Sequence, residues 1–168
     1  MNIYIDPSIN NTGYAIADHE KIVDSGVIRT KAEGDIERLL ELSRGLQEVL
    51  GNKELGIIRL AVVEVPGSFS YGRSTGKWSG KGVNQSALHK LNMAIGAIAL
   101  TLKMWGVEVE TVEAHKWKAG RKKKLDTAIA QHYAGRKVGP DEGDAIMLAV
   151  WHNHGEIAGD MVADTSRK

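Results

Sequence analysis

Apolar and polar positions alternate along the chain in patterns that predict five strands. The segments 2–6, 12–18 and 21–30 are short and apolar or alternating, and turn-like SINN and DHEK separate them, which is typical of an antiparallel meander. The segment 56–65, GIIRLAVVEV, is nearly continuous and rich in β-branched residues, which is typical of a strand buried on both faces. A short alternating segment, 107–112, is the last predicted strand.

Helical spacing of apolar residues predicts helices over 35–50, 86–105, 125–133 and 141–152. Asp35 is the expected N-cap of the first helix. Apolar residues cover more than one side of 86–105, so this helix either lies at the centre of the fold or shares a face with a partner chain. Helices that connect single strands favour parallel pairing. The predicted fold class is therefore α/β, a five-stranded mixed sheet with helices on both faces.

Composition is that of a globular protein, with 168 residues of which 42% are hydrophobic and 26% charged. We expect one domain over 1–154 and a C-terminal tail over 155–168 that frays. No stretch approaches the roughly 20 apolar residues of a membrane span, and a secretion signal is not apparent at the N-terminus. The chain has no cysteine, which excludes disulfides and thiolate metal sites. These features favour a cytoplasmic protein.

The net charge is only +1, but basic residues are concentrated in one segment. Over 116–137 the chain is rich in lysine and arginine, and Asp126 is the one acid. Such a segment can bind phosphates or can be a solvated surface, and charge alone does not decide between the two.

Acidic residues stand at the ends of predicted elements. Asp6 ends the first strand, Glu64 ends the fourth, and Asp141 and Asp144 begin the last helix. Each also has a purely structural interpretation: a turn residue before proline, an edge charge, and an N-cap with an acid at the N3 position of a capping box.

Together, these acids favour a metal site. In an open α/β sheet, ligands bind outside the carboxyl ends of the strands, so the acids can converge there. Converged carboxylates repel one another unless protons or cations neutralise them. Oxygen ligands suit Mg²⁺ or Mn²⁺, and two such ions about 3.5–4 Å apart can activate water and stabilise the leaving oxygen in phosphodiester hydrolysis.

Three segments resemble the RuvC-type Holliday junction resolvases. IYIDPSINNTGYAI is similar to that family's first strand and turn, AVVEVP to its second acid on the fourth strand, and GPDEGDAIMLAVWH to its closing D-x-x-D-A helix. SGVIRT and NQSALHKLNMAIGAI match its third strand and long helix. Ser8 and Ala15 stand where the family has glycine.

The resemblance implies a ribonuclease H-like fold, a homodimer, and divalent-metal cleavage of four-way DNA junctions. It assigns Asp6, Glu64, Asp141 and Asp144 as the catalytic, metal-binding set. The implied cofactor is Mg²⁺, with Mn²⁺ able to substitute. His152 stands at a family-like offset, which makes it a candidate for supporting the metal ligands.

The glycine-rich and serine-rich loop over 67–85 interleaves aromatic residues with cations. Such residues can stack on unpaired bases and contact phosphates, or Phe69 and Trp78 can pack under the loop as a local cluster. Lys118 matches a basic position of the family. The expected DNA-binding residues are Phe69, Tyr71, Arg73, Lys77, Lys81, Lys116, Lys118, Arg121, Lys122, Lys123 and Lys124.

The leading hypothesis is a crossover junction endodeoxyribonuclease of DNA recombination and repair, which nicks branched DNA in pairs by attack of water on the scissile phosphate. Three alternatives stay open: another ribonuclease H-like nuclease acting on flaps or RNA/DNA hybrids, a non-catalytic junction-binding protein, and a sugar-kinase or actin-like half domain. A phage-type member with broader specificity, placed in the host cytoplasm, is also open. A branch-migration partner is not identified.

Overall fold

A computed structural model describes residues 1–52, 55–67, 85–118 and 123–154, with the side chains of 123–125 left out. The strands are β1 (Asn2–Asp6), β2 (Asn11–Asp18), β3 (Lys21–Arg29), β4 (Leu60–Val65) and β5 (Glu108–Glu113). The helices are α1 (Asp35–Leu50), α2 (Gln85–Met104), α3 (Ala114–Lys118), α4 (Lys123–Ala134) and α5 (Pro140–His154). The predicted tail over 155–168 lies outside the described residues.

The five strands form one mixed sheet in the order β3-β2-β1-β4-β5. The first three strands pair antiparallel as a meander, and β4 and β5 add in parallel on the other side of β1. Both features confirm the predicted topology. Strand β1 is therefore central, and its carboxyl end lies beside that of β4.

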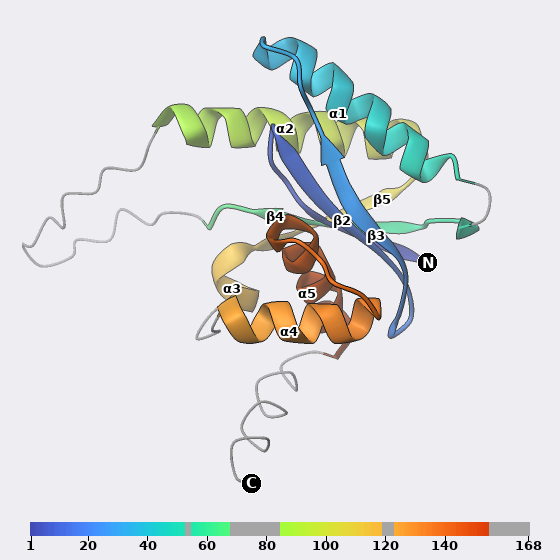
Figure 1. Cartoon of the computed structure of the whole chain (residues 1–168). Helices are drawn as coiled ribbons and strands as arrows, with labels where there is room; N and C mark the ends of the chain where they lie inside the picture. The colour runs from blue at the N-terminus through green and yellow to red at the C-terminus, as the bar shows by residue number, and fades with distance from the viewer. Residues whose placement is uncertain (53–54, 68–84, 119–122, 155–168) are drawn as a thin grey trace, which may run out of the picture.

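Helices cover both faces of the sheet, as Figure 1 shows: α1 and α2 lie on one side, and α3, α4 and α5 on the other. Successive strand residues alternate between the two cores. Ile3 and Ile5 of β1 pack with the α1–α2 layer, whereas Tyr4 between them packs with α5. Strand β4 does the same, with Val62 toward α5. The central strands are thus buried on both sides, as their apolar runs predict.

This alternation decides where two of the candidate acids point. Strands β1 and β4 run in register up to the pair Ile5 and Val63. Asp6 and Glu64 each follow that pair by one residue, so both continue on the α5 side of the sheet, like Tyr4. Neighbouring parallel strands of equal register therefore bring the two carboxylates together at the same edge.

Gly13 brings the last helix directly onto the sheet. It lies in β2 opposite Asp6, and it is buried. A Cβ atom built on Gly13 would overlap the backbone carbonyl of Asp141 at the start of α5. Only glycine leaves room for this approach. The first turn of α5 therefore rests on β2 beside the end of β1.

Both predicted N-caps are wrong, the first by one residue and the second by two. The N-cap of α1 is Gly34, and Asp35 is the first helical residue, whose carboxylate pairs with Lys90 at 2.9 Å. Helix α5 begins at Pro140, and the amide of Gly143 donates to the carbonyl of Gly139 at 2.8 Å. Gly139 is therefore the cap position, Pro140 occupies the first helical position that suits proline, and Asp141 lies inside the first turn.

Two further boundaries differ from the prediction. The strand expected over 56–65 begins at Leu60, because Gly56 has a positive φ of 67° and ends the extended run. The short helix α3 directly after β5 was not predicted, since five residues are too few for a helical apolar pattern. In the ranges that the structure describes, every helix is too short or too polar to span a lipid bilayer.

The contact between Gly13 and α5 predicts a large effect of one methyl group. Gly13→Ala should lower the free energy of unfolding by about 1–3 kcal/mol, because the first turn of α5 must shift away from β2. Gly96→Ala is the matched control: a Cβ there meets nothing within 4 Å, so alanine should stabilise α2 by about 0.5–1 kcal/mol. Urea denaturation measures both, and equal effects would contradict the assignment.

Candidate active site

Three acids from distant parts of the sequence surround one ammonium group. The Nζ atom of Lys118 lies 2.9 Å from Glu64, 3.3 Å from Asp144 and 3.9 Å from Asp6. These residues come from β1, β4, α3 and α5. The predicted convergence of carboxylates at the carboxyl ends of β1 and β4 is therefore present, with a lysine at its centre.

Residues of α3 fix the position of Glu64. Lys118 donates to its Oε1 atom at 2.9 Å, and the indole of Trp117 donates to its Oε2 atom at 3.0 Å. Trp117 is almost fully buried in the core beneath α5, and the ammonium of Lys118 lies 4.7 Å from its ring centroid. Because α3 follows β5 without a loop, the parallel pairing of β4 and β5 brings this Trp-Lys pair to Glu64.

The site raises the pKa of Asp6. Burial is the main cause, and repulsion from Glu64, Asp144 and Asp141 adds to it. Attraction to Lys118 opposes these effects, and the resulting pKa of Asp6 is about 7, compared with an ordinary value of 3.8. A carboxylate whose ionisation is this unfavourable gains from any additional cation nearby.

The pKa of Lys118 is also raised, which in a lysine favours the charged form. Burial alone would lower the pKa of its ammonium, but attraction to Asp6, Glu64 and Asp144 outweighs burial and raises that pKa above the ordinary value of 10.5. Lys118 is therefore charged at neutral pH and neutralises part of the acidic cluster.

Asp141 belongs to the cluster at a greater distance than the other acids. Its effect on the pKa of Asp6 is the smallest of the three carboxylate repulsions. Its backbone carbonyl packs on Gly13, while its side chain is half-buried in the first turn of α5. The position excludes the helix-cap interpretation and leaves the carboxylate facing the same region as Asp144.

The donor set suits a divalent cation, although the side chains are not arranged as a coordination shell. Within the described parts of the chain, no group of three or more acids or histidines is close enough to hold a metal ion. The contacts of Lys118 with the carboxylates span 2.9–3.9 Å, whereas Mg²⁺ binds oxygen at about 2.0–2.1 Å. Carboxylate oxygens are nevertheless the type of ligand that Mg²⁺ prefers.

Of the other predicted site residues, the structure describes the side chains of His152 and Lys116, and neither joins this cluster. The Nδ1 atom of His152 lies 3.3 Å from the hydroxyl of Tyr4, and its Nε2 atom lies 3.8 Å from Glu110. His152, near the C-terminal end of α5, thus contacts residues of β1 and β5, and the structure does not bring it to the acids around Lys118. Lys116 is exposed on α3. Phe69, Tyr71, Arg73, Lys77, Trp78, Lys81, Arg121 and Lys122 and the side chains of Lys123 and Lys124 lie outside the described residues.

Sequence reasoning missed the residues that hold the acids in place. Trp117 stands between two lysines, and an aromatic residue inside a basic run was the available signal for a buried contact. Glu142 is an acid that is only 7% exposed, and the reasoning passed over it in favour of Asp141 and Asp144. No local pattern identifies its partners, Ser25 and Arg136, because one of them lies more than a hundred residues away in β3.

Comparison of the fold with solved structures gives matches that extend over nearly the whole chain, among them two structures of one protein. Thermus thermophilus RuvC in complex with a Holliday junction substrate matches with a TM-score of 0.65 and 19% identity, covering 91% of this chain and 95% of that one. A second Thermus thermophilus RuvC structure matches with a TM-score of 0.64 and 19% identity, covering 94% and 95%. The predicted RuvC-type, ribonuclease H-like fold is thereby confirmed.

Sequence comparison adds nothing to the likeness of fold. No protein-family model matches the chain, and no curated protein matches it significantly in sequence.

The raised pKa of Asp6 predicts how stability depends on pH in metal-free buffer. Between 3.8 and about 7, the folded protein keeps a proton that the unfolded chain has released. Stability contributed by this proton is therefore present at low pH and is lost as the pH rises through that window. Asp6→Asn should remove this loss and make the protein more stable than wild type at pH 8. Urea denaturation from pH 4 to 8 measures the free energy of unfolding of both proteins, with exposed Glu48→Gln as control. The prediction is contradicted if the free energy of unfolding depends on pH in the same way in Asp6→Asn and in wild type.

Proposed function

We propose that the protein is a metal-dependent endonuclease that resolves Holliday junctions or related branched DNA by paired nicks. The single observation that carries the proposal is the convergence of Asp6, Glu64 and Asp144 around one cation position in a RuvC-type fold. One matching structure is a RuvC bound to a Holliday junction substrate, which supports branched DNA as the substrate class.

In this mechanism the acidic residues hold divalent metal, with Mg²⁺ as the expected ion and Mn²⁺ as a substitute. Bound metal supplies activation of water and stabilisation of the leaving oxygen at the scissile phosphate. Asp6, Glu64 and Asp144 would contribute the carboxylates, and Asp141, in the first turn of the helix that carries Asp144, is the fourth candidate. Trp117 keeps Glu64 oriented by its hydrogen bond. Cleavage is direct, without a covalent enzyme intermediate.

Lys118 has two partners in this mechanism. Without metal, it neutralises the acids. Bound metal would neutralise the acids in place of the Lys118 ammonium, and the Lys118 side chain would then be able to contact a DNA phosphate. The predicted DNA-binding role of Lys118 is thus compatible with its position among the acids. Lys116, two positions earlier on α3, is exposed and available to a second phosphate.

One observation favours a second candidate, a junction-binding protein without catalysis. Lys118 already compensates the acids, so negative charge facing DNA does not by itself require metal. Tight binding of four-way junctions with no nicking in Mg²⁺ or Mn²⁺ identifies this candidate. Cleavage of RNA/DNA hybrids or flaps in preference to four-way junctions identifies another ribonuclease H-like nuclease.

We also propose a homodimer that forms through α1 and α2. The two helices run in the same direction, with contacts between Asp35 and Lys90 near their starts and between Ser43 and Thr101 further along. Both helices expose large apolar side chains, and exposed apolar side chains that adjoin one another are typical of protein–protein interfaces. These are Ile36, Leu40, Leu100 and Met104, with exposed fractions of 59%, 53%, 64% and 74%.

Substitution of one acid tests the nuclease. Asp144→Asn should reduce cleavage of a synthetic four-way junction in Mg²⁺ by at least about a hundredfold, because one metal ligand is lost. Binding of the junction in Ca²⁺, measured by gel mobility, should be retained. Exposed Asp18→Asn, which also removes one carboxylate, is the control. Full activity of Asp144→Asn would overturn the proposal.

Sedimentation tests the dimer. At micromolar concentration the wild-type protein should sediment as a dimer, and the double substitution Leu100→Glu and Met104→Glu should give a monomer, since charged groups cannot be buried unpaired at such an interface. Ile57→Glu changes an equally exposed residue, with 74% of its surface accessible, and should leave the dimer intact. A monomeric wild-type protein would contradict this proposal.

A further inference from the structure

We infer that Ser25, Arg136 and Glu142 are positioning residues for the candidate metal site: they form a clamp that fixes the rotation of α5 and thereby the place of Asp144. The inference rests on the proposed function, because it concerns the same acids. These three residues, which we call the α5 clamp, link the first turn of α5 and the segment before it to β3.

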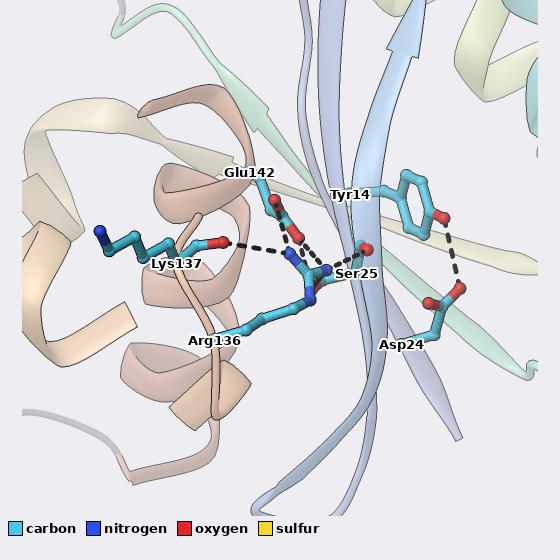
Figure 2. Close-up of polar contacts among 6 residues, drawn as sticks. All are labelled: Tyr14, Asp24, Ser25, Arg136, Lys137 and Glu142. Atoms are coloured by element: carbon cyan, nitrogen blue, oxygen red, sulfur yellow. Dashed lines mark hydrogen bonds and ion pairs between the residues drawn. The ribbon is translucent and has the colours of Figure 1, made fainter. Parts of the chain in front are cut away.

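The contacts of the α5 clamp form a closed network, shown in Figure 2. Arg136 donates to both oxygens of Glu142, at 2.5 and 3.3 Å. The hydroxyl of Ser25 donates to Oε1 of Glu142 at 2.7 Å. Arg136 also donates to the backbone carbonyl of Ser25 at 2.9 Å. One carboxylate and one guanidinium therefore connect the helix to an edge strand at several points.

Burial makes this network necessary. Glu142 is only 7% exposed, and an unpaired carboxylate at such a position is strongly unfavourable. Its hydrogen bond to Arg136 is the main reason that the pKa of the guanidinium is raised above its ordinary value. The two oxygens of Glu142 bind a forked donor and a hydroxyl, which restricts the carboxylate to one geometry.

The position of Glu142 on α5 connects the clamp to the site. It stands between Asp141 and Asp144, and at 100° per residue its side chain points roughly opposite to that of Asp144. While Glu142 is held against β3, Asp144 is directed toward Lys118. A rotation of α5 by about 10° would move a side-chain oxygen about 6 Å from the helix axis by about 1 Å.

Other directional contacts of this helix lie mostly toward its C-terminal end, where Asn153 accepts a hydrogen bond from Tyr4 at 2.8 Å and donates one to the carbonyl of His19 at 2.6 Å. The approach to Gly13 sets how close the first turn lies to β2. The buried residues from Ala145 to Val150 pack without directional bonds, and apolar packing tolerates small rotations better than a bidentate ion pair does. Apart from the ion pair of Asp144 with Lys118, the directional restraint at the N-terminal end of α5 therefore comes from the clamp.

Metal binding by clamp variants tests the inference. Mn²⁺ is titrated into the full-length protein by calorimetry, without DNA, for wild type, Glu142→Gln, Arg136→Met and Arg136→Lys. Glu142→Gln and Arg136→Met should weaken Mn²⁺ binding by about tenfold or more, as for residues that orient metal ligands. Arg136→Lys retains the charge and one contact, so it should fall between these variants and wild type.

The control is Tyr14→Phe. Its hydroxyl, on β2, donates to Asp24 of β3 at 3.2 Å, on the face of the sheet opposite to the α5 clamp (Figure 2). This variant loses a polar contact and some thermal stability without touching α5, so its Mn²⁺ affinity should equal that of wild type. A purely structural role of the α5 clamp would make Arg136→Lys and Glu142→Gln resemble Tyr14→Phe, with lower melting temperature and unchanged Mn²⁺ binding.

The result for the wild-type protein separates the two proposals. Mn²⁺ binding in wild type with unchanged affinity in the clamp variants overturns the clamp and leaves the nuclease proposal standing. Absence of Mn²⁺ binding in wild type overturns the metal-dependent function and the clamp together. Weakened binding in the clamp variants, with Tyr14→Phe like wild type, supports both.

Discussion

The close packing of α5 on β2 at Gly13 is the constraint on which the site depends. Gly13 pairs with Asp6 in the sheet, and its missing side chain lets the backbone of Asp141 lie against it. The first turn of the last helix is thus placed beside the end of the first strand. Asp144, one turn further along, then reaches the same ammonium group as Asp6. A bulkier residue in β2 would hold these two acids apart.

Buried negative charge at the carboxyl ends of β1 and β4 lowers the stability of the fold. The pKa of Asp6, raised to about 7 mainly by burial and further by its acidic neighbours, reflects how unfavourable that charge is. Attraction to Lys118 offsets part of the cost of ionising Asp6. Residues held in an unfavourable state are concentrated at functional sites, because the surrounding structure stabilises them. The contrast with Glu142 supports this view, since that buried acid has a complete set of partners.

Most of the architecture could be predicted from the sequence, because it rests on patterns with a period. Alternation and β-branched runs identified the five strands, and helical spacing identified α1, α2, α4 and α5. Three acids of the candidate site were also predictable, since Asp6 and Glu64 lie at the ends of strands that parallel pairing brings together and Asp144 lies near the start of a helix. Helix caps were misplaced by one residue at Asp35 and by two at Asp141, because both are good capping residues that closely follow the glycines occupying the cap positions.

The supporting contacts could not be predicted, because they join segments that no local pattern relates. The indole of Trp117 reaches Glu64 across 53 positions of the sequence, and Ser25 reaches Glu142 across 117. Lys118 was expected to face DNA, and its place among the acids depends on the unpredicted helix α3. Side-chain positions of this kind follow from packing in three dimensions, which one sequence does not encode in any short segment.

The separation of the acids along the chain has a consequence for biosynthesis. Asp6 in β1 is made before Glu64 in β4, and Asp144 is made later than both, at the start of α5. During translation the early strands can pair while the last helix is still within the ribosome, and domains fold as their segments emerge. The acidic cluster is complete only after α5 docks, so a nascent chain cannot assemble the full set of carboxylates. Maturation of the site is therefore coupled to completion of the fold.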